Sequence, residues 1–165
     1  MKLDTIELVG SWVDVSEYQK GCSLLHIDVK INNEVVETSN SVDVFRAYSN
    51  WFNSNNGWYP QQNRSCFYLF SCSCGDAGCA GIWNGIRVKV RKNTVEWRVK
   101  KKDGYEFLDK TFYSFDHKQY EKAYNDFFFW LGMQDDVDSK LCTDLGYYEG
   151  GETTVDQFFE WVEQQ

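Results

Sequence analysis

The sequence predicts an α+β protein: one globular domain over residues 1–165, with a mainly antiparallel sheet and about three helices. Stretches with a two-residue apolar period outnumber stretches with helical spacing, and the two kinds do not alternate as they would in a parallel α/β fold. No internal repeat, low-complexity tract or linker divides the chain. A composition of 42% hydrophobic residues with one proline excludes disordered and collagen-like chains.

The first third of the chain is expected to contain two strands and a helix. Residues 6–15 and 24–31 are rich in β-branched and large apolar side chains and predict strands. Residues 32–40 contain three asparagines and are expected to form a connection. Ser41 then offers an N-cap for residues 42–53, where apolar side chains recur at helical spacing.

The middle of the chain is expected to add further strands. Residues 66–74 are one candidate strand. The clearest pattern lies at 86–99, where apolar and charged residues alternate on both sides of a turn at 92–94. This pattern predicts an antiparallel hairpin with one face on the core, and its parity places Trp97 in that core. A second hairpin is expected over 103–113.

Two helices are expected in the last third. Asp116 and Gln119 form a capping-box pattern, and the apolar residues that follow repeat at three and four positions, which predicts a helix over 117–131. Thr154 and Gln157 repeat the pattern before a C-terminal apolar stripe, which predicts the last helix.

Charge is segregated along the chain. The net charge is −8, yet residues 1–133 carry 16 acids and 16 bases, so the whole imbalance lies beyond them. Residues 87–102 carry eight bases and one acid. A surface formed by these bases would suit binding to nucleic acid. However, Trp97 is expected to be buried and so cannot stack on a base, and the net charge opposes approach to a polyanion. We therefore expect a solvated basic face and no nucleic-acid partner.

The sequence also predicts a compartment. Lys2, Asp4 and Glu7 interrupt the apolar stretch that a secretory signal requires. The longest run of large apolar residues, 127–131, is far shorter than the roughly 20 residues that span a bilayer. We expect a cytoplasmic protein with no membrane partner, in which the six cysteines are thiols.

Four cysteines, Cys66, Cys72, Cys74 and Cys79, suggest a zinc site. If residues 66–74 form one strand, Cys66 and Cys74 lie about 26 Å apart, so all four cannot bind one ion. Cys72, Cys74 and Cys79 could still meet at a hairpin end, with a fourth ligand from Cys22, Cys142, His26, His117 or an acid. The alternatives are small buried hydrophobic groups or a reactive redox pair, and no metal or cofactor is assigned.

The stretch from Ser71 to Trp83, SCSCGDAGCAGIW, resembles a C-x-C-G-x-x-G-C-A-G-I signature of small bacterial cytosolic proteins. Some proteins of this kind are immunity partners of polymorphic or contact-dependent growth-inhibition toxins. The resemblance therefore implies a toxin inhibitor whose partner is a cognate toxin protein, and it implies no catalytic residue.

The acidic segment after the 117–131 helix is the candidate toxin-binding surface. Negative charge speeds the encounter with a basic partner, and tyrosines supply contact area that loses its water on binding. An ordinary solubilising loop is the simpler alternative. The predicted binding residues are Asp135, Asp136, Asp138, Asp144, Tyr147, Tyr148, Glu149 and Glu152.

No serine-hydrolase, zinc-protease, phosphate-loop or dinucleotide motif is present in the sequence. We therefore expect an immunity protein that binds and neutralises a cognate toxin domain, such as a basic nuclease, and not an enzyme. Two alternatives stay open. One is a structural or regulatory module that binds metal through the cysteine motif, and the other is an unrecognised enzyme that uses His26 or His117 beside a carboxylate.

Overall fold

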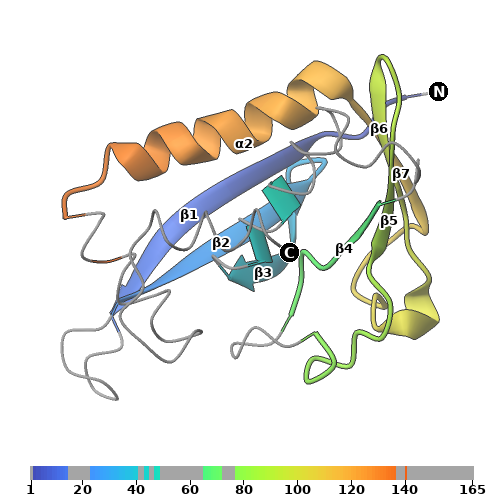
Figure 1. The fold of residues 1–165 in the computed structure, drawn as a ribbon, viewed down its shortest axis with the longest axis horizontal. Coiled ribbons are helices and arrows are strands. Elements are labelled where there is room, and N and C mark those ends of the chain that lie inside the picture. Colours follow the sequence, from blue (N-terminus) through green and yellow to red (C-terminus); the bar gives the residue numbers. More distant parts are fainter. Residues whose placement is uncertain are drawn as a thin grey trace.

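The computed structural model describes residues 2–14, 23–40, 43–44, 47–48, 65–71, 77–136 and 140. These residues form a three-stranded sheet in the order β1-β2-β3, a four-stranded sheet in the order β4-β5-β6-β7, and one complete helix, α2. Figure 1 shows α2 lying along β1, with the second sheet at the end where the helix begins. The predicted α+β class is confirmed, but the strands divide into two antiparallel sheets.

The first sheet consists of β1 (Ile6–Asp14), β2 (Ser23–Ile31) and β3 (Glu34–Asn40). The two strands predicted near the N-terminus are thus confirmed. The predicted connection at 32–40 is wrong, because most of it is β3. Asn32 and Asn33 have φ angles of 55° and 69°, and two successive left-handed residues make the tight turn that suits a twisted hairpin. The asparagines therefore mark a turn between strands.

The second sheet consists of β4 (Ser65–Phe67), β5 (Ile86–Val90), β6 (Thr94–Arg98) and β7 (Phe112–Asp116). The predicted β5–β6 hairpin is confirmed. The strand predicted at 66–74 is shorter, since β4 ends at Phe67 and residues 68–71 are not strand.

The second predicted hairpin, at 103–113, is wrong. A short 3-10 helix, η1 (Lys101–Asp103), ends at Gly104, whose φ of 98° is left-handed. An added Cβ at Gly104 would lie 2.4 Å from the Gly81 carbonyl oxygen, so the chain needs glycine at this turn. The strand that follows, β7, pairs with β6 because Tyr113 and Phe115 pack against Trp97.

Helix α2 (His117–Gly132) begins as predicted, because the Asp116 side chain accepts a hydrogen bond of 3.0 Å from the Gln119 backbone N–H. The described part of the chain holds this one complete helix instead of about three. Of the helix predicted at 42–53, four residues are described and helical. The Asn40 Oδ1 atom accepts from the Asp43 N–H at 2.8 Å, which is a capping contact at the start of these helical residues, and the predicted cap Ser41 lies outside the described residues. The predicted C-terminal helix lies outside the described residues.

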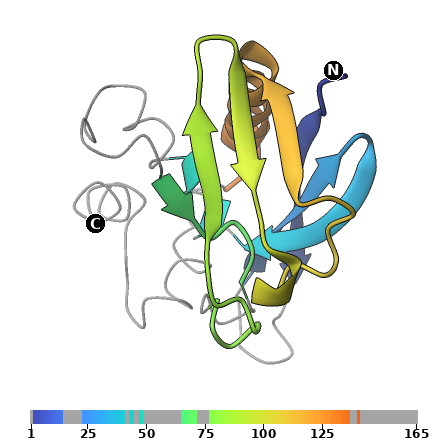
Figure 2. The ribbon, with the colours of Figure 1, turned by 90° about the vertical axis from the view of Figure 1, so that its right-hand side faces the viewer.

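The core consists of buried side chains from both sheets and α2. Figures 1 and 2 show how these elements are arranged around it. Trp97 is fully buried, as its parity predicts, and contacts four aromatic rings edge-on: Phe67, Tyr113, Phe115 and Tyr120. The Trp97 indole N–H also donates to the Tyr120 hydroxyl at 3.2 Å. Within the described residues, no helix has both the length and the apolar character that crossing a bilayer requires.

Candidate functional site

Only the first two of the predicted toxin-binding residues lie in the described part of the chain. Asp135 and Asp136 are exposed just beyond the end of α2. Asp136 has a left-handed φ of 53°, and its carbonyl oxygen accepts from the Lys140 N–H at 3.0 Å. The predicted residues that lie outside the described part are Asp138, Asp144, Tyr147, Tyr148, Glu149 and Glu152.

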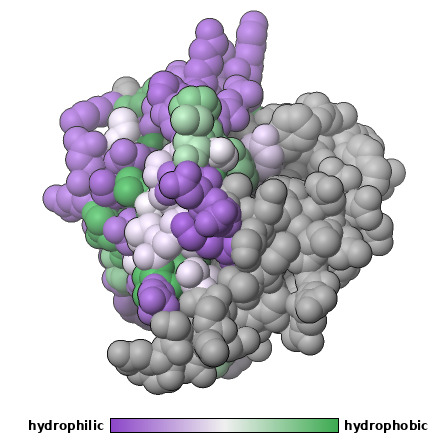
Figure 3. Space-filling view, turned by 90° about the vertical axis from the view of Figure 1, so that its left-hand side faces the viewer, coloured by the Kyte–Doolittle hydropathy of each residue, from purple (hydrophilic) through white to green (hydrophobic). Residues whose placement is uncertain are grey.

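The last turns of α2 add apolar groups beside these acids. Phe129 and Met133, one helical turn apart, are 73% and 69% exposed. The buried stripe of the helix faces the core with Tyr120, Ala123, Tyr124, Phe127 and Leu131. In Figure 3, which shows the end of the molecule where α2 terminates, hydrophobic side chains lie between hydrophilic ones. We call Asp126, Phe129, Met133, Asp135 and Asp136 the α2 end patch.

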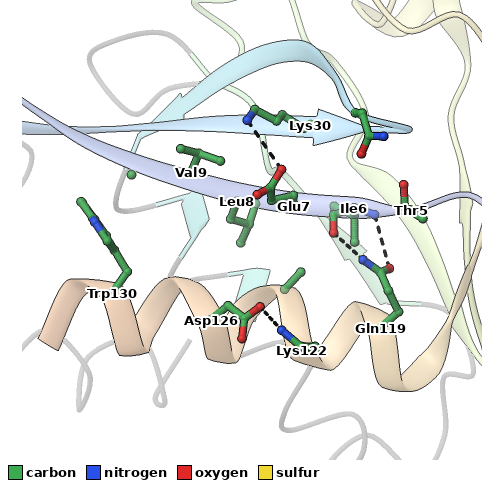
Figure 4. A pocket seen from close by; sticks show the side chains of 13 residues that line it. Thr5, Ile6, Glu7, Leu8, Val9, Lys30, Gln119, Lys122, Asp126 and Trp130 are labelled. Carbon is green, nitrogen blue, oxygen red and sulfur yellow. Dashed lines mark hydrogen bonds and ion pairs between the residues drawn. The ribbon is translucent and has the colours of Figure 1, made fainter. Parts of the chain in front are cut away.

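A groove of about 560 Å³ separates β1 from α2 (Figure 4). At one end of the groove, the Gln119 side chain bonds to the backbone of Ile6. At the other end Trp130 lies over Gly10, where an added Cβ would come within 2.1 Å of the indole ring. Glycine therefore allows the helix to approach the strand closely.

The charged side chains of this groove are paired with one another. Lys30 lies 3.6 Å from the Glu7 carboxylate, and Lys122 forms an ion pair with Asp126 one turn along α2. Figure 4 shows both pairs along the walls of the groove. Because each charge has its partner, these groups suit holding the helix against the sheet more than binding a charged ligand.

A second cavity, of about 500 Å³, lies on the second sheet beside η1. Figure 2 shows this sheet face-on, with no described helix or strand in front of β5 and β6. The lining residues come from the end of the hairpin opposite its turn and from the segments next to it: Asn84, Gly85, Arg87, Arg98, Val99, Lys100, Asp103, Thr111 and Phe112. We call this space the basic cavity.

The two arginines of the basic cavity are direct cross-strand partners. Partners in an antiparallel pair project from the same face, so Arg87 and Arg98 bring two positive charges together. The Arg98 guanidinium also lies 5.5 Å from the centre of the Phe112 ring. The next pair on this face is Lys89 with Glu96, and Glu96 also forms an ion pair with Arg91. Near the turn of the hairpin an acid thus lies opposite a base, whereas at the cavity a base lies opposite a base.

An exposed tryptophan, Trp83, lies next in sequence to this lining. Trp83 is 70% exposed and directly precedes the lining residues Asn84 and Gly85. Its backbone N–H donates to the carbonyl oxygen of Asp103, another lining residue, at 3.2 Å. Trp97, the aromatic residue within the basic stretch 87–102, is buried, as expected. The exposed tryptophan nearest in sequence to the cavity lining is Trp83, at the end of the cysteine motif.

The two histidines lie apart from both cavities. His26, on β2, is half-buried opposite Ser11 and Asn40. His117 begins α2, and its Nδ1 atom lies 3.2 Å from the Arg91 carbonyl oxygen. Neither histidine lines the groove or the basic cavity. The enzyme alternative thus gains no support from the described residues.

The cysteine motif is described only in part. Cys79 is exposed. Cys72 and Cys74 lie outside the described residues, so the zinc alternative stays a hypothesis. Within the described ranges, no three histidine, cysteine, aspartate or glutamate side chains are close enough to hold a metal ion.

Comparison with known proteins identifies no relative: no family model matches the chain, and no curated protein or solved structure matches it.

Proposed function

We propose that this chain is an immunity protein that binds a cognate toxin domain and neutralises it, and that the α2 end patch is part of its binding surface. The observation that supports the proposal most directly is the exposure of Phe129 and Met133 side by side, next to acidic side chains. Asp135 and Asp136 belong both to this patch and, in sequence, to the acidic segment predicted to bind a toxin.

Phe129 and Met133 are suited to act as anchors. Single exposed apolar residues are common on protein surfaces, but two large ones a helical turn apart form a continuous apolar area. Complete burial of a large apolar side chain contributes about 1.5–3 kcal/mol, so covering both would supply a useful part of the affinity of a typical complex. Neither side chain belongs to the buried stripe of α2.

The acids around these anchors are suited to steering. Asp135 and Asp136 are exposed, and no base lies between Trp130 and Asp136. Rim charges of this kind act mainly on the association rate, and their effect falls as salt concentration rises. A basic partner, such as a toxin domain that attacks nucleic acid, fits this surface by charge.

The test uses the toxin domain encoded by the reading frame next to this one. Binding kinetics are measured by biolayer interferometry at low and high salt, together with rescue of growth when both proteins are expressed. Phe129→Ala with Met133→Ala should raise the dissociation rate. Asp135→Asn with Asp136→Asn should lower the association rate and flatten its salt dependence, and asparagine tolerates the left-handed backbone of Asp136.

The controls are matched in charge and exposure but lie elsewhere. Glu34→Gln with Glu106→Gln removes two exposed acids from the β2–β3 turn region and the loop before β7. Trp83→Ala removes an aromatic side chain that is 70% exposed, in the segment before β5. No binding of the toxin domain by the wild-type protein would overturn the proposed function. Tight binding that the patch variants leave unchanged would instead overturn the assignment of the surface.

A further inference from the structure

We propose that the basic cavity binds a nucleotide, with the phosphate held by Arg87 and Arg98 and the base stacked on Trp83. This inference does not depend on the immunity function, because it concerns the second sheet and residues that are not part of the α2 end patch. It rests on three features: two arginines that are direct cross-strand partners, an exposed tryptophan next in sequence to two lining residues, and a cavity lined by both arginines.

The arginine pair supplies the phosphate-binding group. Like charges directly opposite each other weaken a strand pair, and the neighbouring position avoids this cost by pairing Lys89 with Glu96. Among the described residues, neither Arg87 nor Arg98 forms an ion pair with an acid. Two guanidinium groups on one face present planar sets of N–H donors, which match phosphate oxygens in geometry and charge. Lys100 adds a third positive charge to the lining.

Trp83 supplies a surface for the base. An exposed indole can stack on a planar ring, and such stacking contributes about 1–3 kcal/mol per base. The hydrogen bond from the Trp83 N–H to Asp103 fixes the backbone of Trp83 against the segment that lines the cavity. The side chains of Asn84, Asp103 and Thr111 offer donors and acceptors for the polar edges of a base or sugar.

The size and charge of the molecule favour a single nucleotide over a polymer. A volume of about 500 Å³ lies within the usual range of small-molecule sites. A net charge of −8 opposes the approach of a long polyanion, whereas a mononucleotide interacts mainly with its local site. The cavity is therefore a better match for a free nucleotide than the whole basic face is for a nucleic-acid strand.

The test is calorimetric titration of the full-length protein with three probes: adenosine monophosphate, inorganic phosphate and a short oligothymidylate. Adenosine monophosphate should bind. Arg87→Gln and Arg98→Gln should each weaken its affinity by roughly tenfold or more, as expected for the loss of a hydrogen bond to a charged group. Trp83→Ala should weaken binding of adenosine monophosphate but leave the weaker binding of inorganic phosphate unchanged.

Two control variants distinguish the cavity from general effects of charge and aromatic content. Lys89→Gln removes one positive charge from the same face of β5 outside the cavity lining, and it should change the affinity by less than about twofold. Phe129→Ala removes an equally exposed aromatic side chain on α2 and should have no effect. All the altered side chains are exposed, and circular dichroism verifies that each variant is folded.

Three outcomes would overturn the proposal. The first is the absence of binding by adenosine monophosphate. The second is an affinity that Arg87→Gln and Arg98→Gln leave unchanged. The third is tighter binding of oligothymidylate than of the mononucleotide, with an affinity that Lys89→Gln lowers as much as Arg98→Gln does. The ligand would then be a polymer lying over the whole basic face.

Discussion

The side-chain amide of Gln119 makes both hydrogen bonds to Ile6 that a neighbouring strand would make. Its Nε2 atom donates to the Ile6 carbonyl oxygen at 2.6 Å, and its Oε1 atom accepts from the Ile6 N–H at 3.3 Å. The two residues are 113 positions apart. The contact attaches the first turn of α2 to the edge of β1 that does not pair with β2 (Figure 4).

Replacing Gln119 with alanine should lower the free energy of unfolding by about 1–3 kcal/mol, because a partly buried N–H and C=O of Ile6 would lose their partners. Urea denaturation followed by circular dichroism measures the change. Gln134→Ala is the control, because among the described residues the Gln134 amide bonds to one group, the carbonyl of Trp130 at the helix end, where water can replace it. Equal losses in the two variants would contradict the role given to Gln119.

Asp4 should make stability depend on pH in the acid range. Burial opposes ionisation of its carboxyl group, but hydrogen bonds from Asn32, Lys110 and the Ser114 N–H outweigh burial and hold the pKa below its ordinary value of 3.8. The folded state therefore favours the ionised form. The resulting stabilisation is complete above pH 3.8 and is lost as the pH falls through the lower pKa of the folded state.

Asp4→Asn should therefore lower the free energy of unfolding by about 1–3 kcal/mol at neutral pH, as expected for a carboxylate with charged partners. The difference from wild type should shrink at pH values below 3.8. Urea denaturation at a series of pH values measures it. Asp126→Asn is the control, because the Asp126–Lys122 pair is exposed and should contribute less than about 1 kcal/mol. A difference that stays constant from neutral to acid pH would exclude this explanation.

Two buried tyrosines should respond differently to loss of the hydroxyl group. The Tyr120 hydroxyl accepts from the Trp97 indole and lies 3.4 Å from the Tyr124 hydroxyl. Tyr120→Phe should cost about 1–3 kcal/mol of unfolding free energy, because it leaves a buried indole N–H without this partner. Tyr124→Phe leaves that bond in place and should cost less. Thermal or urea unfolding measures both, and a larger loss in Tyr124→Phe would show that the assignment is wrong.

The same tyrosines predict a loss of stability at alkaline pH. Burial raises the pKa of Tyr124 to about 12 and that of Tyr120 well above 10.0, its ordinary value. The unfolded chain therefore ionises first, so stability should fall as the pH rises above 10.0. The fall should be shallower in Tyr124→Phe than in the wild type.

The sequence alone determined the elements whose signal is local. Alternation on both sides of a short turn specified the β5–β6 hairpin and the burial of Trp97, and a capping residue with helical spacing specified α2. These patterns predict the structure correctly because they indicate which side of an element faces the core, and a few neighbouring residues are enough to show that. The asparagine pair that precedes β3 is a local signal too, but it marks a tight turn and not the connection that the composition of 32–40 predicts.

Only the tertiary structure decided how the elements meet. A capping-box pattern directs the Gln119 amide back to its own helix, yet the amide bonds to Ile6, because packing of the aromatic core places α2 against β1. Pairing of β7 with β6 likewise depends on rings gathered around Trp97. The basic cavity needs a hairpin, the residues around Asp103 and the residues after Trp83 side by side. Such contacts join residues that are far apart in the chain, so the short-range spacing of apolar residues cannot predict them.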